Sequence, residues 1–408
     1  MSTTLRPTSP ATARTPGRGW PAVGSVMAGI FAIVTTEILP IGLLTPIGAT
    51  FRISDGTAGL MMTLPGAVAA VAAPAVTVAV RRADRRAVLC GLMLALALAD
   101  LLNALAPGYW AVLTARIVLG VVIGAFWSLG AGLAPRLVGA ERQARANSVI
   151  FSAVPLGSVL GVPAGVLLGH LAGWRAAFAA MALLSLAVAA ALAVTLPALP
   201  PQAPTRLAVL RGLLRTGPVR AGLVVTLLLV TAHFGTYTYV TPFLEDVTHA
   251  GPDAVSVLLL VYGAAGVAGN FAGGLWAGRR RGALTLAIGL LAASVLLLPV
   301  LGASRPGAVL LLVTWGLAYG AVPVCVQAWF VRAAPRAPEA ATVVFTSSFQ
   351  ATISLGALAG GAVVDASSPS AVLVVGGCVA LLAAAVAQVG SRSVSATPGK
   401  ATPGKATA

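Results

Sequence analysis

The sequence predicts an all-α membrane protein with twelve transmembrane helices arranged as two pseudo-repeat halves of six. The first observation is composition, because the 408 residues are 58% hydrophobic and only 9% charged, whereas a soluble domain carries about 25% charged residues. The second is that the apolar residues form runs of about 20, the length that crosses a bilayer as a helix. The third is that positive charges alternate between successive connections, as membrane topology requires.

Twelve such apolar runs follow one another along the chain. The expected helices cover residues 21–47, 57–80, 87–106, 109–134, 146–171, 174–196, 221–244, 254–278, 282–302, 307–331, 340–364 and 371–390. The longest connection, 197–220, is interpreted as a cytoplasmic linker between an N-terminal half at 21–196 and a C-terminal half at 221–390. Residues 1–20 are rich in Thr, Pro and Arg and residues 391–408 end in a short repeat, so both are expected to be disordered cytoplasmic tails.

The basic residues test the number of helices. With twelve helices, 22 of the 26 Lys and Arg residues fall in the tails and connections of one side, three fall on the opposite side, and Arg116 lies within a helix. Positive charges are retained on the cytoplasmic side, and a single missed helix would reverse the alternation after it. The distribution therefore supports twelve helices and predicts that both chain ends lie in the cytoplasm, in a bacterial plasma membrane.

Net charge and cysteine content exclude several classes of protein. The formal net charge is +16, but nucleic-acid binding needs a basic face or stripe, and these charges are dispersed over short connections. Cys90, Cys325 and Cys378 lie in apolar runs without the spacing of a zinc site. The sequence has no motif of a nucleotide-binding loop, a serine hydrolase or a metalloprotease. Neither an enzyme nor a bound cofactor or metal is therefore expected.

The two halves resemble each other weakly in sequence. The basic group 81–86 follows the second expected helix and 279–281 follows the eighth, while Pro163–Gly165 in the fifth corresponds to Gly360–Gly361 in the eleventh. Both separations are close to 198 residues. Parallel repeats of this kind occur in transporters whose substrate site lies between the halves, near the bilayer midplane.

The fourth expected helix, residues 109–134, carries a single charge, Arg116, in an otherwise apolar run. An Arg at the centre of a membrane helix costs about 3 kcal/mol on insertion scales, and it needs an acidic partner or a water-filled cavity. Glu37 in the first helix and Asp100 in the third lie within one or two helical turns of the same depth. We expect a buried cluster in which Arg116 is the counter-ion and one acid binds and releases a proton. A static salt bridge between helices is the alternative.

The fifth expected helix carries Gly157, Gly161, Gly165 and Gly169 at intervals of four, together with Pro163. Glycines at this spacing lie on one face and permit close backbone contact, and Pro bends a helix. The pattern indicates a hinge and a sliding seam between the halves. Static tight packing is the alternative.

Polar and aromatic residues in the later helices are candidates for lining a substrate site. His233 and Tyr237 lie one turn apart in the seventh helix, and rings that carry polar atoms suit a ligand of mixed polarity. An aromatic belt near the membrane interface would give the same pattern. Asn270, Gln327 and Gln350 are expected either to contact the ligand or to hydrogen-bond a neighbouring helix.

Four stretches resemble motifs of the major facilitator superfamily, in particular of its bacterial drug:proton antiporters, which include chloramphenicol, arabinose and purine exporters. They are EILPIGLLTPIG from Glu37, RIVLGVVIG from Arg116, GSVLGVPAG from Gly157 and GWRAAF from Gly173. The resemblance implies the superfamily's fold of two six-helix halves. It also implies an acidic coupling residue at Glu37, a role in proton transfer for Arg116, and an exporter from the motif at Gly157.

One motif departs from the family pattern. The loop between the second and third helices of the family usually reads GxxxDRxGRR, whereas the aligned stretch here is TVAVRRADRR from Thr77. The basic residues Arg82, Arg85 and Arg86 remain, while both glycines are absent and Arg81 stands in the position of the Asp. A cytoplasmic gate loop at these positions would need Asp84 to replace the missing acid.

The sequence therefore predicts a multi-pass transporter that exports small, moderately apolar organic molecules, of the drug or multidrug type, in exchange for protons by alternating access. The proton gradient is the energy source, since each entering proton gains about 2.3 kcal/mol per 100 mV. An exporter of sugars or nucleosides, or an uncoupled facilitator, is the first alternative, and a non-transporting receptor or assembly partner is the second. The expected partners are the substrate, protons and the lipid bilayer, and the protein is expected to be a monomer.

Overall fold

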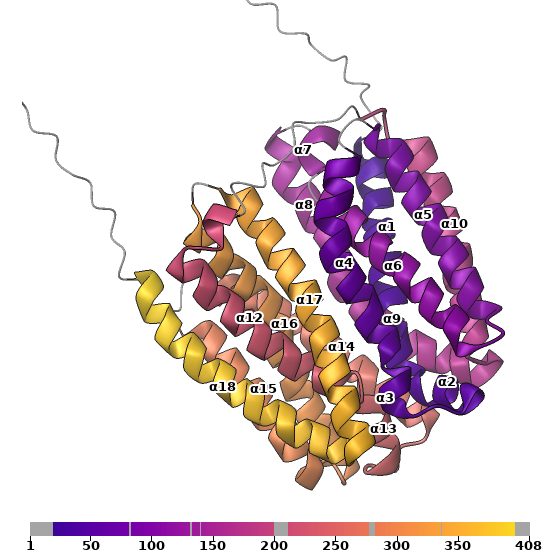
Figure 1. Ribbon diagram of the computed structural model, residues 1–408, viewed down its shortest axis with the longest axis vertical. Helices are drawn as coiled ribbons and strands as arrows, with labels where there is room; N and C mark the ends of the chain where they lie inside the picture. The colour runs from indigo at the N-terminus through magenta and orange to yellow at the C-terminus, as the bar shows by residue number, and fades with distance from the viewer. Residues whose placement is uncertain are drawn as a thin grey trace, which may run out of the picture.

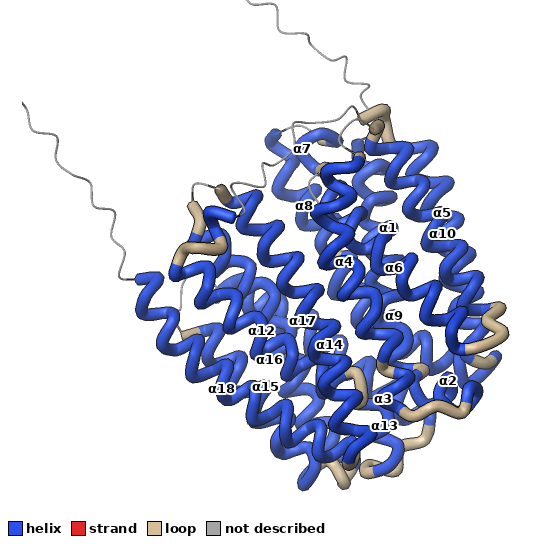
Figure 2. The backbone as a smooth tube through the Cα atoms, viewed as in Figure 1, coloured by secondary structure: helices blue, strands red, loops and turns tan. Residues whose placement is uncertain are grey.

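The computed structural model describes residues 19–80, 83–130, 133–138, 140–199, 211–276, 282–335 and 337–395. Over these residues the chain forms helices and short connections, without a strand (Figure 2). Within the same residues, eleven helices are long and apolar enough to cross a membrane, and the shorter apolar segment Val159–Ala172, the greater part of α9 (Ala153–Ala172), lies at the place of the twelfth. The predicted all-α membrane fold with twelve spanning helices is therefore confirmed.

The helices of the N-terminal half form six spanning segments. They are α1 (Gly19–Ile38), η1 (Leu39–Gly42) and α2 (Leu44–Phe51); α3 (Asp55–Ala58) and α4 (Leu60–Ala79); α5 (Arg85–Ala104); α6 (Tyr109–Gly130); α8 (Gln143–Phe151) and α9 (Ala153–Ala172); and α10 (Trp174–Thr195). The short helices α7 (Ala134–Leu137) and η2 (Ala140–Arg142) connect the fourth segment to the fifth.

The C-terminal half repeats this plan with longer helices. It consists of α12 (Gly217–Tyr237) and α13 (Val240–Asp246), α14 (Pro252–Trp276), α15 (Ala283–Leu301), α16 (Arg305–Ala333), α17 (Pro338–Ala366) and α18 (Pro369–Ser395). The last helix continues five residues beyond its expected end at 390, because Val389–Ser395 contains no Pro and its single Gly does not interrupt the helix. Residues 1–18 and 396–408, in the expected tails, and residues 200–210 of the linker lie outside the described residues.

The first and seventh spanning segments are not the continuous helices expected at 21–47 and 221–244. α1 ends at Ile38 and gives way to the 3-10 turn η1, while α12 ends at Tyr237 and α13 begins at Val240. A proline follows each break, Pro40 in the first segment and Pro242 in the seventh. Proline has no N–H to continue the helical hydrogen bonds, so the backbone carbonyl four residues before it is left without its usual donor.

The two halves lie side by side, and Figure 1 shows the N-terminal one in indigo to magenta and the C-terminal one in orange to yellow. Within the N-terminal half α5 packs between α6 and α10, and within the C-terminal half α12 packs between α17 and α18. The main contacts between the halves are α4 with α17 and α9 with α14. These pairs join the second segment to the eleventh and the fifth to the eighth, so they are equivalent under a repeat of six segments.

The halves are held together at one end of the molecule, which we name the closed end. It carries α2, α3 and α13, and Figure 1 shows the two halves diverging from it toward α7 and α8. Hydrogen bonds cross between the halves there, from Thr45 Oγ1 to Glu245 Oε2 (2.7 Å), from Thr241 Oγ1 to the Ile41 carbonyl (2.8 Å) and from Ser54 Oγ to Asp365 Oδ2 (2.7 Å). We name the opposite end, with α7, α8 and the start of α5, the basic end.

Candidate functional site

A group of polar side chains lies inside the N-terminal half, and we name Thr36, Glu37, Asp100 and Arg116 the polar core. Arg116 is fully buried on α6, and its Nη1 donates to the Thr36 carbonyl at 2.7 Å. The carbonyl of Thr36 is free to accept because its helical donor would be the backbone N–H of residue 40, and residue 40 is Pro. The proline that ends α1 therefore also creates the acceptor for the buried guanidinium.

Asp100 joins the polar core from α5. Its carboxylate is fully buried and accepts a hydrogen bond from Thr36 Oγ1 at 3.2 Å. Thr36 thus contacts the acid through its hydroxyl and the base through its carbonyl. Among the described residues, neither Asp100 nor Glu37 has an oxygen within 4.0 Å of a guanidinium nitrogen of Arg116. The three predicted residues are brought together, but without the direct salt bridge of the static alternative.

Glu37 points from the last turn of α1 toward the other half. Its side chain is 8% exposed, and its Oε1 accepts a hydrogen bond from Gln350 Nε2 of α17 at 3.1 Å. Gln350 was expected to line the substrate site or to bond a neighbouring helix, and the structure gives it the second of these contacts. Tyr319 of α16 lies within the electrostatic reach of Glu37. Glu37 is therefore the member of the polar core that lies at the contact between the halves.

The C-terminal half places four rings in one stack, which we name the aromatic column. Tyr262 stacks on Tyr237 with ring centres 4.6 Å apart, Tyr237 stacks on His233 at 5.3 Å, and His233 stacks on Tyr319. Trp315 meets the column edge-on, with its ring centre 5.5–5.8 Å from those of Tyr262, His233 and Tyr237. Tyr319, at one end of the column, is half-buried, and the other rings are buried.

A hydrogen bond determines the protonation state of His233 in this column. Trp315 Nε1 donates to His233 Nδ1 at 3.1 Å, and an imidazole nitrogen that accepts a hydrogen bond carries no proton. His233 is therefore neutral, with its proton on Nε2. The sequence singled out His233 and Tyr237 but missed Tyr262, Trp315 and Tyr319. Tyr262 is a single ring in an apolar run of α14, whereas Trp315 and Tyr319 lie four residues apart on α16, the same spacing as His233 and Tyr237, and this signal could have found them.

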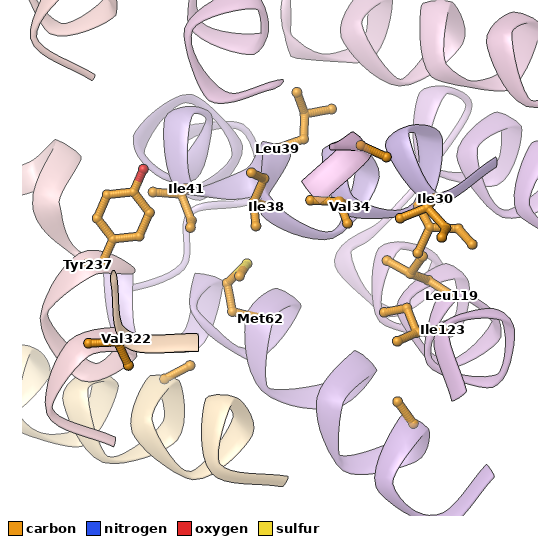
Figure 3. Close-up of a cluster of buried hydrophobic side chains, with 14 of the residues drawn as sticks. Ile30, Val34, Ile38, Leu39, Ile41, Met62, Leu119, Ile123, Tyr237 and Val322 are labelled. Atoms are coloured by element: carbon orange, nitrogen blue, oxygen red, sulfur yellow. The ribbon is translucent and has the colours of Figure 1, made fainter. Parts of the chain in front are cut away.

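Apolar side chains cover the region between the aromatic column and the first segment. Figure 3 shows Ile41 of η1 beside the hydroxyl end of Tyr237, with Met62 of α4 and Val322 of α16 close by. These side chains are all buried. Both halves contribute to this apolar layer.

Two predicted lining residues lie elsewhere. Asn270 on α14 and Gln327 on α16 are half-buried, and in the part of the chain that the structure describes neither side chain is hydrogen-bonded to Glu37 or to a ring of the aromatic column. Their expected contact with a ligand stays a prediction. Within the described residues, no group of three or more His, Cys, Asp or Glu side chains could hold a metal ion.

The glycine face of α9 packs within its own half. Gly157 faces Val34, Gly161 faces Thr35 and Gly165 faces Leu39, all in the first spanning segment. These contacts correct the expectation of a seam between the halves, because spacing gives the face of a helix but not the neighbour that the face meets. α9 approaches α14 of the other half with the rest of its surface. Pro163 lies buried inside α9, and a hinge there stays a prediction.

The loop expected to form a gate is tied to α10. Asp84 caps α5 by accepting from the Arg86 backbone N–H at 2.9 Å, and it also accepts from the Leu199 N–H at 3.0 Å. Arg85 donates its backbone N–H to the Leu199 carbonyl at 3.1 Å, and the Arg86 guanidinium donates to the Ala193 carbonyl. Ala193 belongs to α10 of the N-terminal half, and Leu199 lies at the start of the linker directly after α10. Arg81 lies outside the described residues.

The sequence is similar to a family model and to several bacterial proteins over most of its length. A sequence model described as Major Facilitator Superfamily matches residues 25–346. The inner membrane transport protein YdhP of Escherichia coli K12 is 35% identical, over 87% of this chain and 92% of that protein. The purine ribonucleoside efflux pump NepI of Salmonella enteritidis is 31% identical, over 90% of this chain and 93% of that protein. A Pseudomonas aeruginosa protein named transcription regulatory protein OpdE is 34% identical, over 92% and 94%.

Solved structures are similar in fold. A bacterial homologue of the human lysosomal transporter Spinster, in an inward-facing and unoccupied conformation, has a TM-score of 0.72 at 15% identity, covering 94% of this chain and 98% of that chain. The human organic anion transporter MFSD10 has a TM-score of 0.68 at 19% identity, and the alignment covers 92% of this chain and 100% of that chain. At these identities the likeness concerns the fold alone.

Proposed function

This chain belongs to the Major Facilitator Superfamily and is a multi-pass membrane transporter of small molecules, and we propose that it exports a small, moderately apolar organic molecule in exchange for protons. The observation that carries the proposal is the buried carboxyl group of Glu37, which is hydrogen-bonded to Gln350 of the other half. An ionisable group inside a membrane helix is costly and is usually kept for a function.

Coupling needs a group whose proton affinity differs between two states, and the position of Glu37 meets this need. Its hydrogen bond to Gln350 crosses from α1 to α17 and requires the halves to be in contact. When the halves separate at the closed end, the carboxyl group loses this donor and gains access to water. Hydrogen bonds and solvation are two of the terms that set proton affinity, so a proton binds differently in the two arrangements.

The proposed orientation places the closed end outside the cell. The basic end carries several exposed or half-buried arginines, among them Arg85, Arg86, Arg142 and Arg145, and positive charge is retained on the cytoplasmic side. Both chain ends then lie in the cytoplasm, and the arrangement described here is inward-facing. Opening of the closed end would admit an external proton to Glu37 and release the substrate.

The aromatic column is the proposed substrate wall. Stacked rings bind an apolar or aromatic molecule through its faces, and the half-buried Tyr319 lies at the end of the column nearest Glu37. His233 and Tyr237 act in this proposal as parts of one column rather than as separate contacts. Export of a nucleoside is the second candidate, because a base would stack in the same way and the similar protein NepI is named a purine ribonucleoside efflux pump.

The test is a panel of resistance and uptake assays in a host that lacks its own exporters, with the wild type, Glu37→Gln and Arg116→Ala. We expect Glu37→Gln to abolish efflux driven by a proton gradient while downhill movement of the same substrate continues. Equal activity in all three proteins would rule out the coupling role. Transport by the wild type without a gradient would identify a facilitator, and purified protein that moves no solute in vesicles would favour a receptor or assembly partner.

A further inference from the structure

Two carboxyl groups act on one guanidinium from different sides of α1. Asp100 contacts Thr36 from α5 within the N-terminal half, and Glu37 contacts Gln350 from the other half. The ionisable groups with the largest electrostatic effects on Arg116 are Asp100, Tyr109 and Glu37, in that order. Arg116 is fully buried, so both acids interact with the same buried charge.

The charges of the polar core balance only when one proton is present. Glu37 and Asp100 together would carry two negative charges and Arg116 carries one positive charge. The other ionisable groups that face these three are Tyr109 of α6 and Tyr319 of α16, and a tyrosine supplies no positive charge. An uncompensated charge in a buried site is costly, and such a group takes up a proton instead. One of the two acids is therefore neutral while Arg116 is charged.

Hydrogen bonding indicates which acid holds the proton in this arrangement. Glu37 accepts from the amide of Gln350, and this donor stabilises the ionised form of the Glu37 carboxyl group. Asp100 Oδ2 accepts from Thr36, whereas Asp100 Oδ1 and Asn103 Oδ1 have no hydrogen-bond partner among the described residues. Asn103 is on the same face of α5 one turn away. A proton on Asp100 Oδ1 would give Asn103 Oδ1, an oxygen that can only accept, a donor, and buried polar groups are nearly always bonded.

We propose that Glu37 and Asp100 share one proton, which lies on Asp100 Oδ1 while the closed end is closed, with Arg116 as the counter-ion of whichever carboxylate is ionised. Asp100 is then a second proton-binding site, placed inside the N-terminal half and away from the path between the halves. When the closed end opens and Glu37 leaves Gln350 and takes up an external proton, Asp100 releases its proton to the cytoplasmic side, so the pair still holds one proton and the Asp100 carboxylate becomes the partner of Arg116. This step rests on the proposed coupling function, but the shared proton does not require transport.

The test follows the infrared carbonyl stretch of protonated carboxyl groups in the purified full-length protein in lipid, as pH is raised through neutrality. Two groups that share a proton titrate as a pair. We expect a protonated-carboxyl band in the wild type at neutral pH, and its loss in both Asp100→Asn and Glu37→Gln. Each substitution leaves one carboxylate opposite Arg116, and that carboxylate ionises. Glu245→Gln, which removes a carboxyl group at the closed end, is the matched control and should keep the band.

Every other pattern contradicts the proposal. A band lost only in Asp100→Asn would mean that Asp100 is protonated independently of Glu37, and a band lost only in Glu37→Gln would mean that Asp100 does not hold the proton. A band that survives both belongs to another group. Asp100→Glu covers the case in which Asp100→Asn does not fold, because the longer side chain should shift the band, and an unshifted band would also overturn the assignment. A protein that shows the expected pattern and yet moves no substrate would refute the proposed function alone.

Discussion

The N-terminal half contains the polar core of charged side chains, and the C-terminal half contains the aromatic column at the corresponding place in the repeat. Glu37 and Tyr237 are 200 residues apart in the chain, the same separation as the two hydrogen-bonded pairs Ile41–Thr241 and Thr45–Glu245 at the closed end. Both residues lie in the last turn before their spanning segment breaks. Equivalent backbone positions of the two repeats therefore carry a carboxyl group in one half and a phenol ring in the other.

The comparison extends to the helices behind these residues. Arg116 on α6 and Trp315 on α16 are separated by 199 residues in the sequence, and both are fully buried. Arg116 donates to a carbonyl freed by Pro40, whereas Trp315 donates to the imidazole of His233. In each half a buried donor on the fourth helix of the repeat fixes a group on the first. We infer a division of labour, with proton binding in one half and substrate binding in the other.

Removal of the buried charge should have the largest effect. Arg116→Gln leaves Glu37 and Asp100 without their counter-ion, and loss of one member of a buried charged group costs about 3–5 kcal/mol of stability. The loss should be greater at high pH, because at low pH both acids can be neutralised by protons. Unfolding in lipid, followed over a range of pH, measures it. Coupled transport should be lost.

Arg175→Gln is the matched control for Arg116→Gln. Arg175 also donates to a backbone carbonyl, that of Ala106 at 3.0 Å, but it is half-buried and stacks on Trp174. Its substitution should cost little and leave coupling intact. If Arg116→Gln abolished substrate binding as well as coupling, the division of labour between the halves would fail.

Substitution of Trp315 by Phe should affect the aromatic column of the C-terminal half. The change keeps an aromatic edge against the column but removes the donor to His233 Nδ1, and a buried acceptor left unsatisfied costs about 1–3 kcal/mol. We expect lower thermal stability and about tenfold weaker substrate binding, which corresponds to about 1.4 kcal/mol. The ratio of protons to substrate should not change, and reconstituted vesicles measure both quantities.

Trp329→Phe removes the same kind of donor outside the column. Trp329 Nε1 donates to the Pro218 carbonyl at 3.0 Å, so this variant should lose some stability and keep its substrate affinity. Equal weakening of binding by both substitutions would assign the effect to the fold of the C-terminal half rather than to the column.

The contrast between the halves also marks what the sequence could predict. The depth of Glu37, Asp100 and Arg116 follows from apolar run length and helical rise, and the structure places the three residues around Thr36 without direct contact between the acids and the guanidinium. Sequence could not identify Thr36 as the residue that links them, because that depends on the rotation of α1 about its axis. Of the aromatic column and Trp315, the sequence predicted only His233 and Tyr237. Tyr262 and Trp315 come into contact through the packing of α14 against α16, which the sequence alone does not give.

Pro40→Ala tests whether the helix break supports the polar core. Alanine at this position restores a backbone N–H that can bond to the Thr36 carbonyl and compete with Arg116 Nη1. We expect coupled transport to fall about fivefold, or about 1 kcal/mol, with little change in substrate binding. Pro46→Ala is the control, because Pro46 lies in the first turn of α2, where no helical donor is needed. Unchanged coupling in Pro40→Ala would show that Arg116 does not depend on the freed carbonyl.

The smallest expected effect is the response of the closed end to external pH. Burial raises the pKa of the Glu245 carboxyl group above its ordinary value of 4.5; the nearby Asp246 and Asp55 raise it further, while the hydrogen bond from Thr45 lowers it. A carboxyl group whose pKa is raised in the closed arrangement favours that arrangement while it is protonated. The closed end should therefore be most stable at low pH and lose stability as pH rises above 4.5.

Distances between spin labels on α2 and α13 measure this response. Glu245→Gln should keep the hydrogen bond from Thr45 and flatten the pH dependence, by less than about 1 kcal/mol because the group is partly exposed. Asp253→Asn is the control, since Asp253 is 83% exposed and pairs across the halves with His170 at 3.6 Å. Flattening of the response by Asp253→Asn but not by Glu245→Gln would contradict the assignment of the pH response to Glu245.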